Sequence, residues 1–336
     1  MDTIIWNENQ LKEAANQLRN GDVVAFPTET VYGLGADATN EEAVNRIFRA
    51  KGRPSDNPLI VHISTIDQLE DYVTFVPEKA REVIEHFWPG PCTVILEKKG
   101  NLAPSVTGDL QSVGIRMPDH PLALALIEQV GKPLAAPSAN SSGKPSPTTS
   151  QHVWDDLNGK IAGIIDGGPT GVGLESTVLD LTDPHKPTIL RPGGISKEEL
   201  ESVLGQVYVD THLVDETAAP KSPGMKYRHY SPDKPVWILP QDTEESRQMI
   251  TSLIKNGEVV GLLASEEFIT SVSIQPLNHY SLGKKTLPSQ AASLLYSGLR
   301  EMDQSLVTII LVEPYEKKGI GTAYMNRLEK AAERVL

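Results

Sequence analysis

The stretch KGRPSDNPLIVHI (residues 51–63) marks a change from helix to strand and gathers several polar groups. Before it, NEEAVNRIFRAK (residues 40–51) has helical periodicity, with Asn40 as a cap and acids in the first turn. Gly52 and Pro54 interrupt that pattern, and PLIVHI (residues 58–63) is typical of a buried strand. The stretch therefore predicts a helix–loop–strand unit whose loop carries two cations and an amide.

The sequence on both sides continues this alternation. The expected strands are GDVVAFPTET (21–30), CTVILEKK (92–99), VGIRMP (113–118), PLAAPSAN (133–140), AGIIDGG (162–168), STVLDLT (176–182) and TILRPGG (188–194). The expected helices are PEKAREVIEHFW (77–88), HPLALALIEQVG (120–131) and SKEELESVLG (196–205). Some connections are too short for a crossover helix, so the strands cannot all be parallel. We expect an α/β fold with a twisted mixed sheet and flanking helices.

A second, smaller domain follows a proline-rich stretch. We place the domains at residues 1–208 and 235–336, with a linker at 209–234 that shows no convincing periodicity. The expected strands of the second domain are VWILP (236–240), EVVGLLAS (258–265) and LVTIILVEPY (306–315). The expected helices are EESRQMITSLIKNG (244–257), SQAASLLYSGLREMD (289–303) and GTAYMNRLEKAAERVL (321–336). Strands that alternate with helices predict a small Rossmann-like parallel α/β domain.

Composition excludes several classes of protein. The 336 residues fit two domains, since one domain takes roughly 100–200 residues. A net charge of −13 provides no global attraction to nucleic acid, so any polyanion site must be a local patch. The single cysteine, Cys92, excludes an internal disulfide framework and a cysteine-rich zinc site. Neither a leader pattern nor an apolar run of about 18 residues is present, so we expect a cytoplasmic protein.

Three of the 31 Lys and Arg residues, Arg49, Lys51 and Arg53, fall within five positions. Two cations on an extended segment repel each other unless an anion lies between them, and a guanidinium beside an ammonium suits a polyphosphate. A solvated charge run is the alternative. The known phosphate-loop patterns do not help, because the glycines of PTETVYGLG (27–35) lack the Rossmann spacing and no Walker motif occurs.

Two further clusters leave alternatives open. Arg116 lies in a strand-like apolar context, and a buried arginine must be paired, either with an acid such as Asp119 or with a bound carboxylate. The segment APSANSSGKPSPT (136–148) suits ribose or phosphate oxygens, or is a flexible serine-rich loop. His62 by itself is typical of a core histidine, and Glu29 and Asp166 have no evident partner in sequence. No spacing of His, Cys or Asp suggests a metal held by the protein.

Taken together, the motifs resemble those of the YrdC-like family. The motifs in question are PTETVYGLG, KGRPSDNPLIVHI, WPGPCTVIL, GIRMP, PSANSSGKPS, ESTVLDL and ILRPGG, in this order across residues 10–205. The segment SPGMKYRHYSP (222–232) is similar to the long two-domain form, the threonylcarbamoyl-AMP synthases. The resemblance implies a YrdC-like catalytic domain, a linker that closes over the active-site cleft, and a C-terminal α/β domain.

The resemblance also implies a reaction. ATP, L-threonine and bicarbonate give threonylcarbamoyl-AMP and pyrophosphate, the first step of N6-threonylcarbamoyladenosine formation at position 37 of tRNA. It implies a catalytic pair, Lys51 and Arg53. The residues implied for ATP are Lys51, Arg53, Asn57, Ser112, Ser138, Asn140, Ser146, Arg191 and Tyr230. The residues implied for L-threonine are Thr30, His62, Arg116 and Ser176.

The implied metal is Mg²⁺ carried by ATP, with no protein ligand. The implied partners are a tRNA threonylcarbamoyltransferase and, by a weak contact, tRNA. One rival is a non-catalytic module for double-stranded RNA, tRNA or ribosome maturation, which the acidic composition disfavours. A hydrogenase-maturation carbamoyltransferase is disfavoured by the single cysteine. A third possibility is that the C-terminal domain binds a ligand of its own, but its sequence contains no glycine-rich nucleotide-binding motif.

Overall fold

A computed structural model of the chain describes residues 2–55, 57–210, 230–272 and 278–335. The chain separates into two compact units. The first comprises Met1–Ser142, Ser146–Gly171 and Glu175–Tyr227, and the second comprises Gly143–Pro145, Val172–Leu174 and Arg228–Leu336. Most of the linker predicted at 209–234 lies outside the described residues, so its predicted closure over a cleft stays a prediction.

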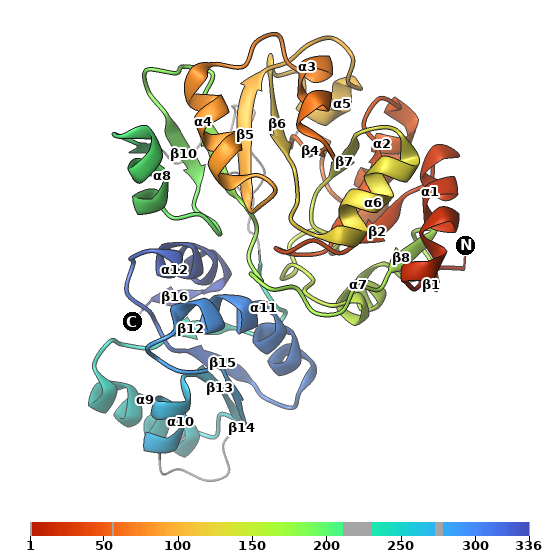
Figure 1. Cartoon of the computed structure of the whole chain (residues 1–336). Coiled ribbons are helices and arrows are strands. Elements are labelled where there is room, and N and C mark those ends of the chain that lie inside the picture. Colours follow the sequence, from red (N-terminus) through yellow and green to blue (C-terminus); the bar gives the residue numbers. More distant parts are fainter. Residues whose placement is uncertain (1, 56, 211–229, 273–277, 336) are drawn as a thin grey trace. The chain divides into compact units, whose positions relative to one another are not determined.

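The first unit is built on a mixed sheet of eleven strands (Figure 1). In the order of the sheet these strands are β1 (Ile4–Trp6), β8 (Gly163–Ile165), β2 (Val24–Phe26), β3 (Gly33–Asp37), β7 (Leu134–Ala136), β4 (Ile60–His62), β6 (Ser112–Arg116), β5 (Cys92–Glu97), β9 (Thr177–Asp180), β10 (Thr188–Arg191) and β11 (Tyr208–Val209). The sheet contains both parallel pairs, such as β4–β6, and antiparallel pairs, such as β5–β6. The prediction of a mixed sheet is confirmed.

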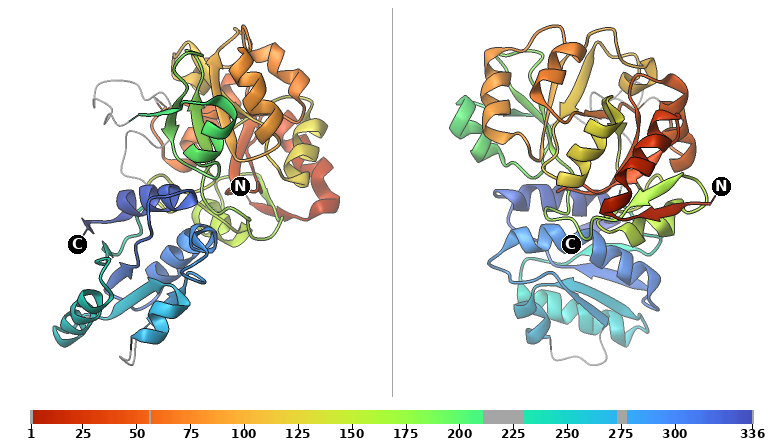
Figure 2. Two further views of the ribbon diagram at one scale, coloured as in Figure 1. Left: turned by 60° about the vertical axis from the view of Figure 1, so that its left-hand side comes forward. Right: turned by 45° about the vertical axis from the view of Figure 1, so that its right-hand side comes forward.

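Helices cover both faces of this sheet. Their bounds are α1 (Leu11–Arg19), α2 (Glu41–Lys51), α3 (Leu69–Tyr72), α4 (Glu78–Phe87), α5 (Pro104–Thr107), α6 (Pro121–Val130), α7 (Ser150–Leu157) and α8 (Lys197–Leu204), with 3₁₀ turns at Glu8–Gln10 and Ile66–Gln68. Helices α1 and α6 lie side by side on one face (Figure 2) and share a core with Val24 and Phe26. Val23 and Ala25 belong to the larger core on the opposite face. Successive residues of one strand thus serve opposite cores, as strand geometry requires.

The same alternation sets apart a polar face on the central strands. In β6, Val113 and Ile115 enter the larger core, so Ser112, Gly114 and Arg116 point to the other side. In β4, Val61 enters that core and His62 faces away from it. β5 follows the same rule, with Cys92 and Val94 in the core and Thr93 opposite. The polar side chains of three adjacent strands therefore share one face.

The second unit is a parallel sheet of five strands with helices between them. Its strands, in the order of the sheet, are β14 (Asn278–Ser281), β13 (Val260–Ala264), β15 (Ile309–Val312), β12 (Val236–Ile238) and β16 (Arg334–Val335). Its helices are α9 (Thr243–Lys255), α10 (Glu266–Ser271), α11 (Pro288–Gln304) and α12 (Ile320–Ala331). All of the strand pairs are parallel, so the predicted parallel α/β domain is confirmed.

Capping signals explain where helix α2 begins and ends. The Asn40 side chain accepts a hydrogen bond from the amide of Ala43, and Gly52 adopts a left-handed conformation with φ of 63°. Lys51 is therefore the last residue of α2, as the helical pattern of residues 40–51 predicted, so Lys51 and Arg53 do not share the extended segment on which both cations had been placed. The elements not expected from the sequence include helices α7 and α10 and strand β14, whose segments are polar and short. The helix predicted over residues 321–336 ends at Ala331, and Arg334–Val335 forms strand β16 instead.

Candidate functional site

Lys51 connects the end of helix α2 to the loop after strand β7. Its Nζ donates hydrogen bonds to the carbonyl of Ser138 at 2.5 Å, to the carbonyl of Asn140 at 2.6 Å and to Asn140 Oδ1 at 3.2 Å. Ser138 Oγ lies 2.5 Å from the same Oδ1. Lys51 is 5% exposed, so its charge is held in a nearly dry environment and fixes the backbone of the Ser138–Asn140 turn.

The rest of the opening stretch forms a second cluster around Asn57. The guanidinium of Arg53 donates to the carbonyls of Asn57 and Pro58, both at 3.3 Å. The Asn57 side chain is fully buried, and neither its oxygen nor its nitrogen has a hydrogen-bond partner among the described residues. Ser112 and Pro58 line one small cavity on the polar face of the central strands. A buried side-chain amide that lacks hydrogen-bond partners can form hydrogen bonds with a polar ligand.

Arg116 and His62 lie opposite each other where strands β6 and β4 pair in register. Arg116 Nε donates to the carbonyl of Gly90 at 3.1 Å, and Nη1 donates to Thr30 Oγ1 at 3.0 Å. His62 Nδ1 donates to the carbonyl of Ile60 at 3.2 Å. Burial, reinforced by the charge of Arg116, lowers the pKa of His62 to about 3. His62 is therefore neutral at physiological pH.

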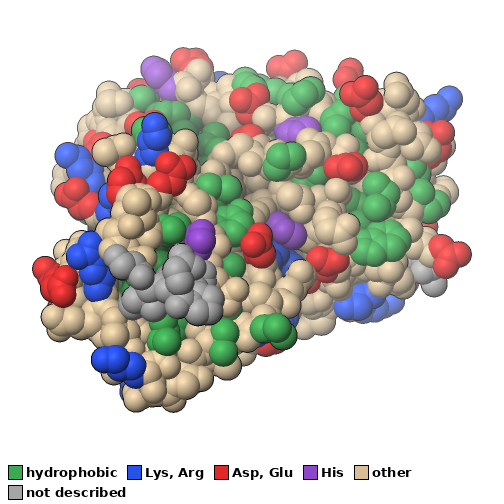
Figure 3. Space-filling model, turned by 90° about the horizontal axis from the view of Figure 1, so that it is seen from below, with side chains coloured by type: hydrophobic (Ala, Val, Ile, Leu, Met, Phe, Trp, Pro, Cys, Tyr) green, Lys and Arg blue, Asp and Glu red, His purple; other side chains and the backbone are tan. Residues whose placement is uncertain are grey.

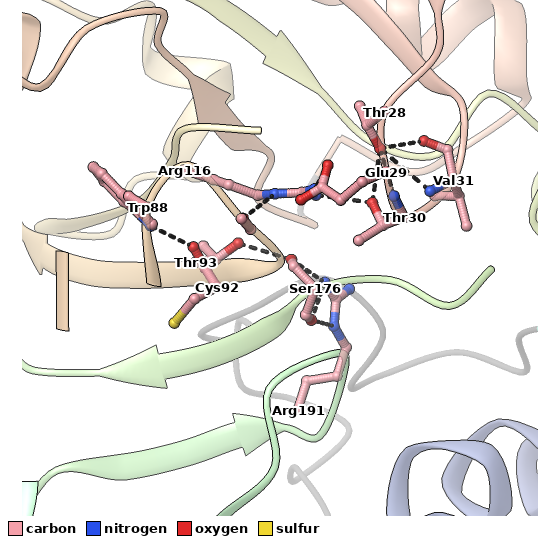
Figure 4. Close-up of polar contacts among 11 residues, drawn as sticks. Thr28, Glu29, Thr30, Val31, Trp88, Cys92, Thr93, Arg116, Ser176 and Arg191 are labelled. Atoms are coloured by element: carbon pink, nitrogen blue, oxygen red, sulfur yellow. Dashed lines mark hydrogen bonds and ion pairs between the residues drawn. The ribbon is translucent and has the colours of Figure 1, made fainter. Parts of the chain in front are cut away.

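The acid partner of Arg116 is Glu29. Glu29 Oε2 lies 2.5 Å from Arg116 Nη2, and Figure 4 shows the carboxylate against the guanidinium. The sequence had left a pair with Asp119 open and had given Glu29 no partner; the structure places Glu29 there instead. Thr28, two residues before Thr30, accepts from the Thr30 amide and donates to the carbonyl of Val31 at 2.7 Å, which fixes this turn.

Ser176 directly precedes strand β9 and is held from two sides (Figure 4). Its Oγ lies 2.8 Å from Thr93 Oγ1, and Arg191 donates from Nε and Nη2 to its carbonyl at 3.1 and 3.0 Å. Ser146 donates to the neighbouring carboxylate of Glu175. Arg191 is 5% exposed, so a second buried guanidinium lies near the same strand end. Thr93 and Glu175 were not singled out from the sequence.

Tyr230 belongs to the second unit. Its ring stacks on Tyr296 with centroids 5.4 Å apart, and the guanidinium of Arg327 lies 5.6 Å from its centroid. Its backbone has φ of 66°, which is uncommon for a residue other than glycine. The predicted contact of Tyr230 with a nucleotide stays a prediction.

The first unit therefore concentrates buried cations and hydroxyl groups in a protein of net negative charge. Lys51, Arg116 and Arg191 are each at most 5% exposed. The thiol of Cys92 does not supply a nucleophile, because burial raises its pKa to about 12. Among the described residues, no group of three or more His, Cys, Asp or Glu side chains is placed to hold a metal ion. The arrangement suits binding of a polyanion and a carboxylate by positioned charges.

Comparisons with known proteins agree with this geometry. The family model Sua5_yciO_yrdC, described as telomere recombination, matches residues 16–193. The model Sua5_C, described as threonylcarbamoyl-AMP synthase, C-terminal domain, matches residues 195–333. In the part of the chain that the structure describes, no helix is both long and apolar enough to cross a membrane.

Full-length relatives extend the match over nearly the whole chain. The threonylcarbamoyl-AMP synthase of Bacillus subtilis is 52% identical over 98% of this chain and 95% of its own. That of Pyrococcus abyssi is 46% identical over 97% of this chain and 94% of its own. The crystal structure of P. abyssi Sua5 complexed with L-threonine superposes with a TM-score of 0.92 at 44% identity and covers 99% of both chains. The chain therefore belongs to the family of two-domain threonylcarbamoyl-AMP synthases, with a Sua5–YciO–YrdC domain followed by a Sua5 C-terminal domain.

Proposed function

We infer that this protein is a threonylcarbamoyl-AMP synthase, an enzyme for the first step of N6-threonylcarbamoyladenosine formation in tRNA. L-Threonine is its amino-acid substrate, in keeping with the L-threonine complex of the P. abyssi relative. The observation that carries the inference is the buried face where Arg116, 3% exposed, meets Thr30 and the neutral His62. A guanidinium fixed there is suited to the carboxylate of an amino acid.

For threonine, we propose Thr30, His62, Arg116 and Ser176 as the binding residues. Arg116 would take the carboxylate, since its planar fork matches that group in two places. His62 is neutral and adds a polar surface without a second positive charge. The positive charge of Arg116 therefore faces the negative charge of the threonine carboxylate. Thr93 and Arg191 hold Ser176 in place, which supports a fixed hydroxyl rather than a mobile one.

For ATP, we propose a nucleotidyl transfer in which the carboxylate of N-carboxythreonine attacks the α-phosphorus and pyrophosphate leaves. Lys51 and Arg53 would lie along the triphosphate, with Asn57, Ser138, Asn140, Ser146, Arg191 and, from the second unit, Tyr230 contributing further contacts. Ser112, which lines a small cavity, would also contact the nucleotide. The buried charge of Lys51 supports this role, because negative charge that builds up on a leaving pyrophosphate needs a positive group already in position.

The substrates in this proposal are MgATP, L-threonine and bicarbonate or CO₂. No covalent enzyme intermediate is required, in keeping with the protonated thiol of Cys92. A dry, closed cleft would protect the labile carbamate and the mixed anhydride from water. The product would pass to a tRNA threonylcarbamoyltransferase, with a weak contact to tRNA as a further proposal.

A non-catalytic RNA-binding role has less support. On the face drawn in Figure 3, Lys and Arg side chains are scattered among Asp and Glu rather than gathered into one basic surface. The net charge of −13 also opposes binding to phosphates outside a local site.

The test is threonine-dependent release of pyrophosphate from MgATP in the presence of bicarbonate. We expect release from the wild-type protein and none from Lys51→Ala or Arg53→Ala. A matched control is Lys197→Ala on helix α8, whose side chain pairs with Glu201 on the surface and should leave the rate unchanged. Release that does not depend on threonine would refute the proposed substrate.

A further inference from the structure

Glu29 is a buried carboxylate whose hydrogen-bonding capacity is only partly used by the described residues. Both of its oxygens are buried and lack a hydrogen-bond donor among the described residues, apart from the ion-pair contact of Oε2 with Arg116 at 2.5 Å. An ionised carboxylate can accept about four hydrogen bonds. The neighbouring hydroxyls already have partners: Thr28 Oγ1 bonds to Thr30 Oγ1 and donates to the carbonyl of Val31, and Thr30 Oγ1 accepts from Arg116. Glu29 thus has unused capacity for a ligand that carries N–H donors.

The charges around Glu29 favour a ligand with both signs. Arg116 from strand β6 pairs with Glu29, and His120, from the turn before helix α6, is close enough for Glu29 to act on its pKa. His62, on strand β4, faces Arg116 and is neutral. Burial lowers the pKa of His120, although Glu29 opposes that shift. The pair Glu29–Arg116 is therefore one carboxylate and one guanidinium in direct contact, in a nearly dry setting.

An α-amino acid is a zwitterion whose carboxylate and ammonium are separated by one carbon atom. If it enters between Glu29 and Arg116, its carboxylate can pair with Arg116 and its ammonium with Glu29. One buried ion pair is then replaced by two, and no charge is left without a partner. A ligand with only a carboxylate would displace Glu29 from Arg116 and leave that acid buried and alone, which is costly.

We propose that Glu29 binds the α-ammonium of L-threonine and accepts the proton that this group must lose before carboxylation. The inference rests on the proposed function and adds a residue for the amine to it. In the overall step, ammonium and bicarbonate give carbamate, water and one proton. The N–C bond forms, the C–OH bond of bicarbonate breaks, and the released proton passes to the Glu29 carboxylate and then to solvent. No oxidant or further reactant is needed.

The experiment compares wild type with Glu29→Gln and Glu29→Asp. The matched control is Asp119→Asn, an exposed acid on the same segment as Arg116 for which no ion pair with Arg116 is found in the described structure. Calorimetry would measure binding of L-threonine, of 3-hydroxybutanoate, which lacks the amine, and of threoninamide, which lacks the carboxylate. Pyrophosphate release would be followed from pH 6.5 to 9.5.

We expect wild type to prefer threonine over 3-hydroxybutanoate, and E29Q to lose most of that preference while still discriminating against threoninamide. We expect E29Q to lower kcat by about 10²–10⁴-fold near neutral pH, with recovery as the pH rises and the free amine deprotonates unaided. E29D should keep part of the rate, and D119N should stay within about twofold of wild type.

A purely structural Glu29–Arg116 pair would give another pattern. E29Q would then lower thermal stability and depress activity equally at every pH, and its preference for the amine-bearing ligand would be unchanged. That result would overturn the role of Glu29 and leave the proposed function intact. If wild type neither bound threonine nor released pyrophosphate, the proposed function would fail, and the inference with it. The preference ratio does not depend on the fraction of folded protein.

Discussion

His62 shows how one buried residue links the site to the stability of the fold. It pairs in register with Arg116, and its ring meets the ring of Phe26 edge-on with centroids 6.0 Å apart. Because its pKa is about 3 in the folded protein and 6.5 in the reference state, the unfolded chain binds a proton between these values and the folded protein does not. The stability that His62 contributes is therefore fully present above pH 6.5 and is lost as the pH falls.

We predict that His62→Gln makes the protein less sensitive to acid. For wild type, the free energy of unfolding should fall by up to about 1.4 kcal/mol per pH unit through this one group as the pH drops below 6.5. Urea unfolding of both proteins from pH 7.5 to 5 would give the two slopes. His185→Gln, at an exposed histidine, serves as the control and should keep the wild-type slope. Identical slopes for wild type and H62Q would contradict the prediction.

Single residues also show how far prediction from sequence reaches. An arginine inside an apolar strand was expected to be buried and paired, and Arg116 is 3% exposed and pairs with Glu29. Glu29 was not predicted as this partner, since it lies 87 positions away and only the pairing of distant segments brings the two together. Thr93 was not predicted for the same reason, since its hydroxyl contacts Ser176 from a different strand.

At the scale of elements, the alternation of side chains along the strands accounts for the polar face. Part of this alternation could be predicted from the sequence. The sequence VGIRMP predicted a strand with Arg116 in it, and the alternation of Val113 and Ile115 with polar positions sets which face Arg116 joins. Helix α7 escaped prediction because it follows a Ser- and Thr-rich stretch and begins with Thr149 as its cap. Local propensity is a weak guide where polar residues serve both as caps and as loop residues.

The segment that follows strand β10 passes close to the start of strand β9, and this leads to a prediction for Gly193. A Cβ at this position would lie 2.2 Å from the amide nitrogen of Thr177 and 2.3 Å from the carbonyl carbon of Ser176. Both are backbone atoms, so the segment that carries Ser176 must move. We expect Gly193→Ala to destabilise the fold by about 1–3 kcal/mol or more and to raise the KM for threonine.

Gly100 offers the matched control, because a Cβ there would meet nothing within 4 Å. Gly100→Ala should change stability by no more than about 0.5 kcal/mol and leave kinetics unchanged. Thermal unfolding and pyrophosphate release would be measured for both variants. If G193A behaved like G100A, the tight packing behind Ser176 would not be needed to hold the site.

For the whole molecule, the class of each sheet was predictable and the strand order was not. Short connections predicted a mixed first sheet, and regular alternation predicted a parallel second sheet. The order places β1 beside β8 and β3 beside β7, and no local signal encodes pairing between strands so far apart in sequence. Such pairings depend on burying both faces of the sheet at once.

The charge of the whole chain yields a further prediction. With a net charge of −13, binding to duplex RNA or tRNA should be weak at 150 mM KCl, with a Kd of about 10⁻⁴–10⁻⁶ M or weaker. Fluorescence anisotropy over a range of KCl concentrations would measure both the affinity and its dependence on salt. Nanomolar binding with a steep salt dependence would favour the RNA-binding role instead.

The most direct test of the central claim follows the carbon of bicarbonate. Purified protein would be incubated with MgATP, L-threonine and ¹⁴C-bicarbonate, and the nucleotides would be separated quickly by chromatography. We predict a new, short-lived adenylate that carries the label, forms only with threonine, and appears in step with pyrophosphate. Pyrophosphate release without a labelled adenylate, or no release with all three substrates saturating, would contradict the assignment as a threonylcarbamoyl-AMP synthase.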